Sequence, residues 1–153
     1  MCVGAFISIP LPGAVPFTLQ TAVIYFAALY LSKKECFFSI LIYILTGVIG
    51  LPVFSGGSSG LGALFGPTGG FIFGFLVMAF VIGTFNDSAY FSIIIGTFVL
   101  YICGVTWFMI KMNADLYTAL TYCVFPFILS DTVKALAANS AYILLKRYKT
   151  ANY

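Results

Sequence analysis

The sequence predicts an all-α integral membrane protein, a six-helix transmembrane bundle with an incomplete first helix. Of the 153 residues, 62% are hydrophobic and 7% are charged, whereas about a quarter of the residues in ordinary soluble domains are charged. The mean hydropathy of +1.11 shows that uncharged polar residues do not make up the difference, so this surface is suited to lipid rather than to water. At about 20 residues per span, the length holds at most about six spans in a single domain, residues 1–153.

The residue inventory limits the chemistry as well. The chain has no histidine, and its four cysteines are far apart with no CxxC pair, so we predict no metal site and no cofactor. A net charge of +3 that is spread along the chain is not the basic face that nucleic acid requires, so we expect no nucleic-acid partner. Only four acidic residues are present and they form no catalytic arrangement, which argues against an enzyme.

The longest uncharged stretch predicts a helical hairpin. Between Glu35 and Asp87 no side chain is ionisable except those of tyrosine and cysteine, and the stretch is far too long to cross a hydrocarbon core of about 30 Å only once. The glycine- and proline-rich segment 50–66 ends helices on both sides. We therefore expect spans at 36–49 and 67–85.

The remaining spans follow from the other uncharged runs. Residues 88–110 have the length of one tilted span, and a last span is expected at 128–145. Residues 17–32 predict a short span, preceded by a proline-rich segment that cannot form regular helix. Ahead of that segment, residues 1–9 cover only about 14 Å as a helix, about half a bilayer. We expect the first helix to be truncated or to start late.

The few positive charges predict the orientation of the bundle. Four expected spans separate the loop of Lys33 and Lys34 from the C-terminal cluster of Lys146, Arg147 and Lys149, so all of these charges fall on one side of the membrane. By the positive-inside rule, this loop and the C-terminus lie in the cytoplasm, and the chain is a multi-pass protein of the cell membrane.

The opposite side of the membrane collects the irregular segments. Lys111 follows an odd number of crossings and lies outside, together with the glycine- and proline-rich segments 10–16 and 50–66. Residues 116–127 are too few for a span. We expect them to lie along the outer interface, in contact with lipid, up to a break at Pro126.

Asp131 and Lys134 are the most informative candidate residues, because the other expected spans carry no Asp, Glu, Lys or Arg. A charged residue at mid-membrane costs about 2.5 to 3.5 kcal/mol on insertion scales. Three residues apart on a helix, the two side chains can pair with each other and serve packing alone. The functional interpretation makes them the polar floor of a ligand cavity. The helix from Lys134 to Lys146 covers about 18 Å, which puts the pair in the outer half of the membrane, beneath the outer loops.

A second candidate site lies in the run 66–74, which begins a span. Pro67 falls where the first turn of a helix tolerates proline. Three glycines recur at every fourth position, at Gly66, Gly70 and Gly74. This spacing is typical of a close-packing ridge between helices. A helix N-terminus with glycine N–H groups can also contact an anion or an amide if it faces the ligand cavity, and both interpretations can hold together.

Thr18 and Gln20 offer hydrogen-bonding groups where the chain enters the span 17–32 from outside. Singly they are weak signals. The 17 Phe and 10 Tyr residues could line an apolar pocket, but aromatic side chains gather at lipid interfaces by default, so none is assigned by position alone.

Four runs of sequence have a more specific meaning together than singly. They occupy residues 15–20, 47–57, 66–75 and 126–134 and spell VPFTLQ, GVIGLPVFSGG, GPTGGFIFGF and PFILSDTVK. In this order and at these spacings they resemble the BioY family, the biotin-binding S components of energy-coupling factor (ECF) transporters. The resemblance extends from about residue 5 to about residue 138.

The resemblance implies a six-helix membrane protein that captures biotin from outside and works with a transmembrane coupling subunit and two cytoplasmic ATPases. The S component itself hydrolyses nothing. The family often has Tyr at the position of Phe71, so one hydroxyl is absent here. Matched residue by residue, the family's binding site falls on the last helix, on the GPTGG helix start and on two outer loops that would cover the ligand, at Asp131, Lys134, Gly66, Pro67, Thr68, Gly69, Gly70, Phe71, Thr18, Gln20, Phe54, Gly56 and Gly57.

Two alternatives to biotin capture stay open on the sequence. Related S components carry thiamine, riboflavin and other vitamins on a similar scaffold, so the ligand would then be another vitamin. In the other alternative the chain is a non-binding membrane scaffold or a small channel. Its glycines would then pack the helices, and the pair of Asp131 and Lys134 would fix their register.

Overall fold

The structure is a computed structural model that describes the backbone of residues 1–11, 15–85 and 88–151. Most of these residues are helical, and two short strands form one antiparallel sheet. In chain order the elements are α1 (Cys2–Phe6), β1 (Ser8–Ile9), β2 (Phe17–Thr18), α2 (Gln20–Tyr30), α3 (Lys33–Val48), the 3-10 helix η1 (Ser55–Gly57), α4 (Gly60–Leu64), α5 (Gly69–Thr84), α6 (Ala89–Met112), α7 (Leu116–Cys123) and α8 (Phe125–Ala151).

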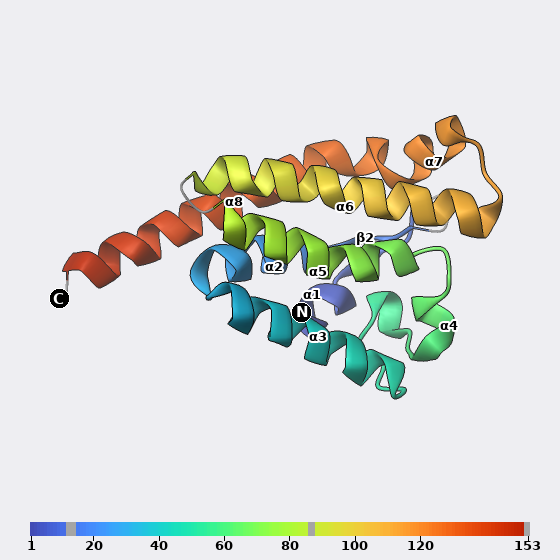
Figure 1. Ribbon diagram of the computed structural model, residues 1–153, viewed down its shortest axis with the longest axis horizontal. Helices are drawn as coiled ribbons and strands as arrows, with labels where there is room; N and C mark the ends of the chain where they lie inside the picture. The colour runs from blue at the N-terminus through green and yellow to red at the C-terminus, as the bar shows by residue number, and fades with distance from the viewer. Residues whose placement is uncertain (12–14, 86–87, 152–153) are drawn as a thin grey trace.

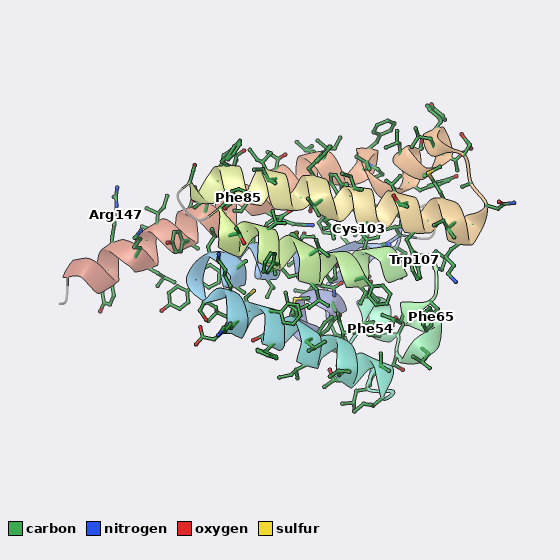
Figure 2. The ribbon with its side chains drawn as sticks, in the orientation of Figure 1. Phe54, Phe65, Phe85, Cys103, Trp107 and Arg147 are labelled. Atoms are coloured by element: carbon green, nitrogen blue, oxygen red, sulfur yellow. The ribbon has the colours of Figure 1, made fainter. Side chains whose placement is uncertain are left out.

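The long helices form one bundle (Figure 1). The most extensive packing joins α5 to α6, α2 to α8 and α3 to α5. The turn from α2 to α3, the start of α6 and the C-terminal end of α8 lie toward one end, while α4, α7 and the end of α6 lie toward the other. Figure 2 shows Arg147 near the first end and Phe65 and Trp107 near the second. The predicted helical bundle is confirmed.

The outer surface of the bundle is apolar. Leu129 is 78% exposed, Phe98 is 65% exposed and Ile42 is 59% exposed, and many other large apolar side chains are exposed on α3, α5, α6 and α8. Two stretches of the described residues are long and apolar enough to cross a membrane, Ala89–Met112 and Leu116–Tyr148. Lipid tails solvate such a surface, which in water would drive association. The chain is a membrane protein, as its composition predicts.

Glycines set how closely α5 approaches α6. A Cβ atom built on Gly74 would lie 2.8 Å from Cδ1 of Leu100, and one on Gly70 would lie 2.6 Å from the carbonyl oxygen of Cys103. Both distances are shorter than van der Waals contact, so the two backbones come this close only because these positions carry no side chain. The predicted close-packing ridge is confirmed at Gly70 and Gly74, whereas Gly66 precedes the helix.

The first part of the chain differs from the prediction. The strand β1 follows α1 directly and pairs with β2. The first helix is short, as expected, but it ends at Phe6 rather than at residue 9, and the span expected at 17–32 becomes helical only at Gln20. Pro10 directly follows β1, and a proline favours extended backbone at the residue before it. Residues 12–14, part of the expected outer loop 10–16, lie outside the described residues.

Two helices begin at other residues than expected. α3 begins at Lys33 because Ser32 and Glu35 form a capping box, in which each backbone N–H donates to the other residue's side chain, at 2.9 and 3.3 Å. α5 begins at Gly69, so Pro67 precedes the helix and does not lie in its first turn.

The break expected at Pro126 lies two residues earlier, at Val124 between α7 and α8. Pro126 lies in the first turn of α8, where a missing N–H costs nothing because the first N–H groups of a helix have no intrahelical partner. α8 consequently extends beyond the expected 128–145 at both ends. Most of the segment 116–127 forms a separate helix, α7, whose N-cap is Asp115.

Candidate ligand-binding site

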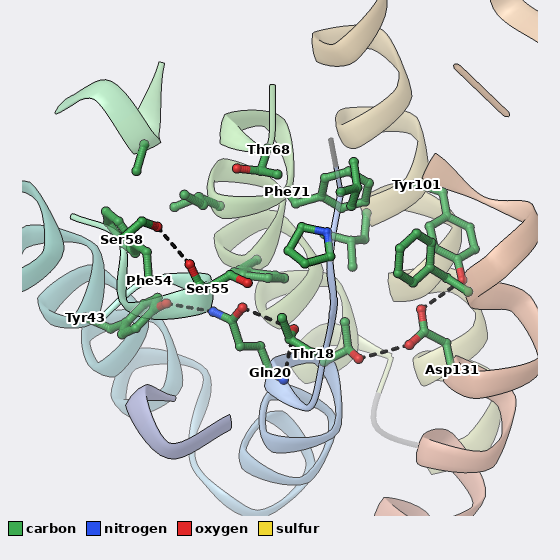
Figure 3. Close-up of a pocket in the computed structure, with 18 of the residues that line it drawn as sticks. Thr18, Gln20, Tyr43, Phe54, Ser55, Ser58, Thr68, Phe71, Tyr101 and Asp131 are labelled. Carbon is green, nitrogen blue, oxygen red and sulfur yellow. Dashed lines mark hydrogen bonds between the residues drawn. The ribbon is translucent and has the colours of Figure 1, made fainter. Parts of the chain in front are cut away.

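A cavity of about 250 Å³ lies among α2, α3, α5, α6 and α8 (Figure 3). The segments that precede α2 and α5, and the 3-10 helix η1, complete its wall. Its volume is close to the lower end of the range for small-molecule sites, about 300 Å³. Charged, polar and aromatic side chains share this wall, and they are arranged in three parts.

One end of the cavity is charged. The Lys134 ammonium lies 2.8 Å from Asp131 Oδ1, and the two side chains are only 7% and 5% exposed. Asp131 also accepts hydrogen bonds from Thr21 Oγ1 at 3.0 Å and from the Tyr101 hydroxyl at 2.8 Å. Among the described residues no buried side-chain nitrogen or oxygen lacks a partner. The buried carboxylate and the buried ammonium group therefore both have partners.

The Lys134 ammonium has two further contacts. It donates to Thr21 Oγ1 at 3.1 Å, and it lies 4.3 Å from the centre of the Phe17 ring. A carboxylate, a hydroxyl and an aromatic face together offset the cost of burying an ammonium group. The expected pairing of Asp131 with Lys134 on one face of the last helix is confirmed.

The other end of the cavity is polar and uncharged. The Gln20 side chain is 4% exposed and donates from Nε2 to the Tyr43 hydroxyl at 2.6 Å. Thr18 Oγ1 donates to Gln20 Oε1 at 3.1 Å, and the Tyr43 hydroxyl donates to the carbonyl of Val53 at 3.0 Å. These hydrogen bonds tie the start of α2 to α3 and to the segment before η1, as Figure 3 shows for Thr18, Gln20 and Tyr43.

The wall between the two ends is apolar. Phe54 is 2% exposed, and its ring occupies the space beside Gly47, where a side chain would overlap it. The same ring meets Tyr43 edge-on, with the centroids 5.6 Å apart. A ligand that fits this cavity is polar at both ends and apolar in the middle. The remaining apolar wall comes from α5, α6 and α8, at Phe71, Ile72, Phe75, Leu100 and Phe127.

The cavity gathers part of the predicted site. Gly56 and Gly57 turn the chain with positive φ angles of 67° and 75°, and they do not reach the lining. The predicted residues that line the cavity are Thr18, Gln20, Phe54, Thr68, Phe71, Asp131 and Lys134. The predicted residues that lie outside its lining are Gly56, Gly57, Gly66, Pro67, Gly69 and Gly70.

Three hydroxyl groups that bind predicted site residues were not anticipated by the sequence reasoning. Thr21 and Tyr101 bind Asp131, and Tyr43 binds Gln20. Only the positions of these residues in the sequence could have indicated a role in the site. Thr21 follows Gln20 directly, and both tyrosines lie inside uncharged spans, where a hydroxyl without a partner is costly.

The fold and the cavity define the class of protein first. A small helical membrane protein whose buried charges and amide converge on one cavity is a membrane-embedded solute-binding protein. The family follows from comparison. The model of the BioY family matches residues 1–151, so the chain belongs to the BioY family, and the resemblance drawn from the sequence is confirmed.

Individual relatives agree with this assignment. The chain is 39% identical over 137 residues to the biotin transporter BioY2 of Lactococcus lactis subsp. cremoris, covering 85% of this chain and 75% of that protein. It is 38% identical over 152 residues to the biotin transporter BioY of Thermotoga maritima, covering 95% and 88%. The crystal structure at 2.1 Å of the S-component for biotin from an ECF-type ABC transporter superposes with a TM-score of 0.86 at 27% identity, over 95% of this chain and 84% of that one.

Proposed function

We propose that this chain captures biotin with high affinity and takes it up across the cytoplasmic membrane, as the substrate-binding subunit of an ECF-type ABC transporter. The observation that carries the proposal is the pair of Asp131 and Lys134, which is buried yet lines the cavity, in a chain of the BioY family. The chain itself contributes capture of the ligand and no catalytic step.

The chemistry of the cavity supports a ligand of this kind. Biotin has a carboxylate at one end, a ureido group with N–H and C=O at the other, and an apolar ring and chain between them. The cavity has a charged end and a neutral hydrogen-bonding end on either side of an aromatic wall. When a polar group of the ligand enters between Lys134 and Asp131, Thr21 and Tyr101 still hold the carboxylate, so its charge keeps partners.

The proposed partners and orientation follow from the family. A structural relative is an S-component of an ECF-type ABC transporter, so the proposed partners are a transmembrane coupling subunit and two cytoplasmic ATPases. The loop of Lys33 and Lys34 and the C-terminus are proposed to face the cytoplasm. Their position at one end of the bundle, away from α4 and α7, supports this orientation.

The direct test is binding of labelled biotin to the purified protein in lipid nanodiscs. We expect saturable binding that unlabelled biotin displaces and that thiamine and riboflavin do not. Stronger displacement by another vitamin would assign that vitamin as the ligand. Absence of saturable binding for the whole panel would favour a scaffold or a channel.

Uptake of labelled biotin by cells tests the partners. We expect uptake to rise when the coupling subunit and both ATPases are produced together with this chain. Equal uptake with and without the ATPases would contradict the proposed partnership and assign transport to the chain alone.

A further inference from the structure

Trp107 on α6 is the only tryptophan of the chain, and it does not line the cavity. Its indole Nε1 donates to the carbonyl of Gly66 at 2.8 Å. Its ring stacks on Phe65, with the centroids 6.5 Å apart and 28° between the planes. Trp107 therefore joins α6 to the segment between α4 and α5 by one hydrogen bond and one ring contact, and Figure 2 shows Trp107 and Phe65 near each other.

The segment that Trp107 holds is part of the cavity wall. This wall segment, residues 60–68, contributes Ala63 and Thr68 to the lining. Leu61 is 56% exposed and Phe65 is 52% exposed, so much of the apolar surface of the wall segment is not buried by the bundle. Leu64 anchors the wall segment in the core of the bundle, and the contact with Trp107 is a second attachment outside that core.

The glycines at the start of α5 make room for the indole. A Cβ atom on Gly69 would lie 3.0 Å from Nε1 of Trp107, and one on Gly70 would lie 2.9 Å from its Cγ. Gly66 supplies the carbonyl that accepts the hydrogen bond. All three glycines of the GPTGG run thus meet Trp107, although none lines the cavity. The GPTGG run therefore has a structural role, which is to accommodate and bind the indole of Trp107 without any contact with the ligand.

Lys111 completes the contact on the same face of α6, four residues after Trp107. Its ammonium lies 5.3 Å from the centre of the Trp107 ring and 5.8 Å from that of Phe65. A cation over two aromatic rings is attracted by both. The three side chains therefore form one cluster at the end of the bundle where α4 lies.

We propose that Trp107 is a positioning residue, which holds the wall segment against the cavity and thereby slows release of the ligand. This rests on the proposed function, because it concerns the same cavity. In this proposal a bound ligand leaves when the wall segment moves away, so weakening its attachment accelerates dissociation more than it changes association. Loss of one hydrogen bond predicts a change of about threefold to tenfold.

Two variants and a control test the proposal. Trp107→Phe keeps a ring but removes the N–H donor, and Phe65→Leu removes the stacking partner at an exposed position. Phe91→Leu is the matched control, since Phe91 is a 58% exposed aromatic residue of the same helix that does not line the cavity. The measurement is the dissociation rate of labelled biotin after addition of excess unlabelled biotin, with association rate and thermal unfolding recorded in parallel.

The expected result is that each test variant dissociates about threefold to tenfold faster, Trp107→Phe through loss of the hydrogen bond and Phe65→Leu through loss of the ring contact. The association rate and unfolding temperature should change little, and the control should behave as the wild type. The double variant should change the rate by less than the product of the single effects, because the hydrogen bond and the ring contact hold the same wall segment. Wild-type dissociation rates in both variants overturn the proposal. If Trp107→Phe does not fold, the dissociation rate of Phe65→Leu alone tests the proposal, and a wild-type rate in that variant overturns it.

Failure of the proposed function gives a different result. In that case the wild-type protein binds no biotin. The fluorescence emission of Trp107, the only tryptophan, then reports whether the indole is in contact with the wall segment. Phe65→Leu should shift this emission to longer wavelength, because the indole becomes more exposed to solvent. An unchanged spectrum in that variant overturns the attachment itself.

Discussion

Asp131 and Lys134 carry opposite charges on one face of α8, and each is the charged partner of the other. Removal of one partner of a buried pair costs about 3 to 5 kcal/mol, whereas replacement of both by apolar residues is often neutral. We predict that Lys134→Met alone lowers the thermal stability strongly. The double variant with Asp131→Leu should regain most of the stability and still bind no biotin. Thermal unfolding in detergent and a biotin-binding assay measure the two effects.

The control and the contradicting outcome concern the same pair. Lys34→Met removes an exposed lysine and should change neither stability nor binding. A double variant at Asp131 and Lys134 that folds and also binds biotin as the wild type does would show that the pair only fixes helix register. That result would favour the scaffold alternative.

Single residues also show what the sequence could and could not predict at the site. Asp131 and Lys134 stood out because charges are rare and costly in lipid. Their partners Thr21 and Tyr101 did not, since threonine and tyrosine are common in membrane helices. Which hydroxyl reaches Asp131 depends on how α2 and α6 pack on α8, and no local pattern records that packing.

At the scale of elements, the contact between α5 and α6 depends on glycine. Gly70→Ala would place a Cβ atom 2.6 Å from the carbonyl of Cys103, so we predict a loss of about 1 to 3 kcal/mol by overpacking. Gly62→Ala is the matched control, because a Cβ atom there meets nothing within 4 Å. Thermal unfolding of both variants checks this, and equal stability would show that α5 and α6 do not pack as closely as described.

The helix α7 gives a prediction on pH. Hydrogen bonds from the Thr118 side chain and from its backbone N–H hold the pKa of the exposed Asp115 carboxyl below its usual 3.8. Because the folded pKa lies below the unfolded one, the cap stabilises α7 above the unfolded pKa, and the stabilisation is lost as the pH falls through the folded pKa. We expect amide exchange in α7, corrected for intrinsic rates, to become faster in that acidic range.

Asp115→Asn is the control for the pH effect. Asparagine caps a helix without titrating, so α7 in this variant should exchange at a corrected rate that does not depend on pH over the same range. The same acid-induced acceleration in both proteins would show that ionisation of Asp115 does not act on the helix.

Element boundaries were the least predictable part of the fold. Charges and glycine-rich breaks located every long helix, because lipid excludes both charge and open backbone. The end of α1 at Phe6 and the pairing of β1 with β2 were missed, since the pairing depends on contact between two segments on either side of a proline-rich turn. The start of α3 was misplaced although Ser32 and Glu35 have the capping-box spacing.

At the scale of the whole molecule, the proposed orientation predicts which residues are reachable from outside the cell. In a background with the four cysteines replaced by alanine, a membrane-impermeant maleimide added to intact cells should label Tyr117→Cys and should not label Lys34→Cys. Tyr117 is 74% exposed on α7, and Lys34 lies at the opposite end of the bundle. The reverse labelling pattern would invert the orientation.

The central claim is that biotin meets the buried pair of Asp131 and Lys134. The measurement that tests it most directly is the Kd of biotin for Lys134→Ala and Asp131→Ala in nanodiscs, on the folded fraction, with Lys34→Ala as the control. Loss of a buried charged partner costs about 2 to 5 kcal/mol, so we predict affinities weaker by about 30-fold or more in both variants and unchanged in the control. Affinities within about threefold of the wild type in both variants, a difference of less than about 0.7 kcal/mol, would contradict the claim.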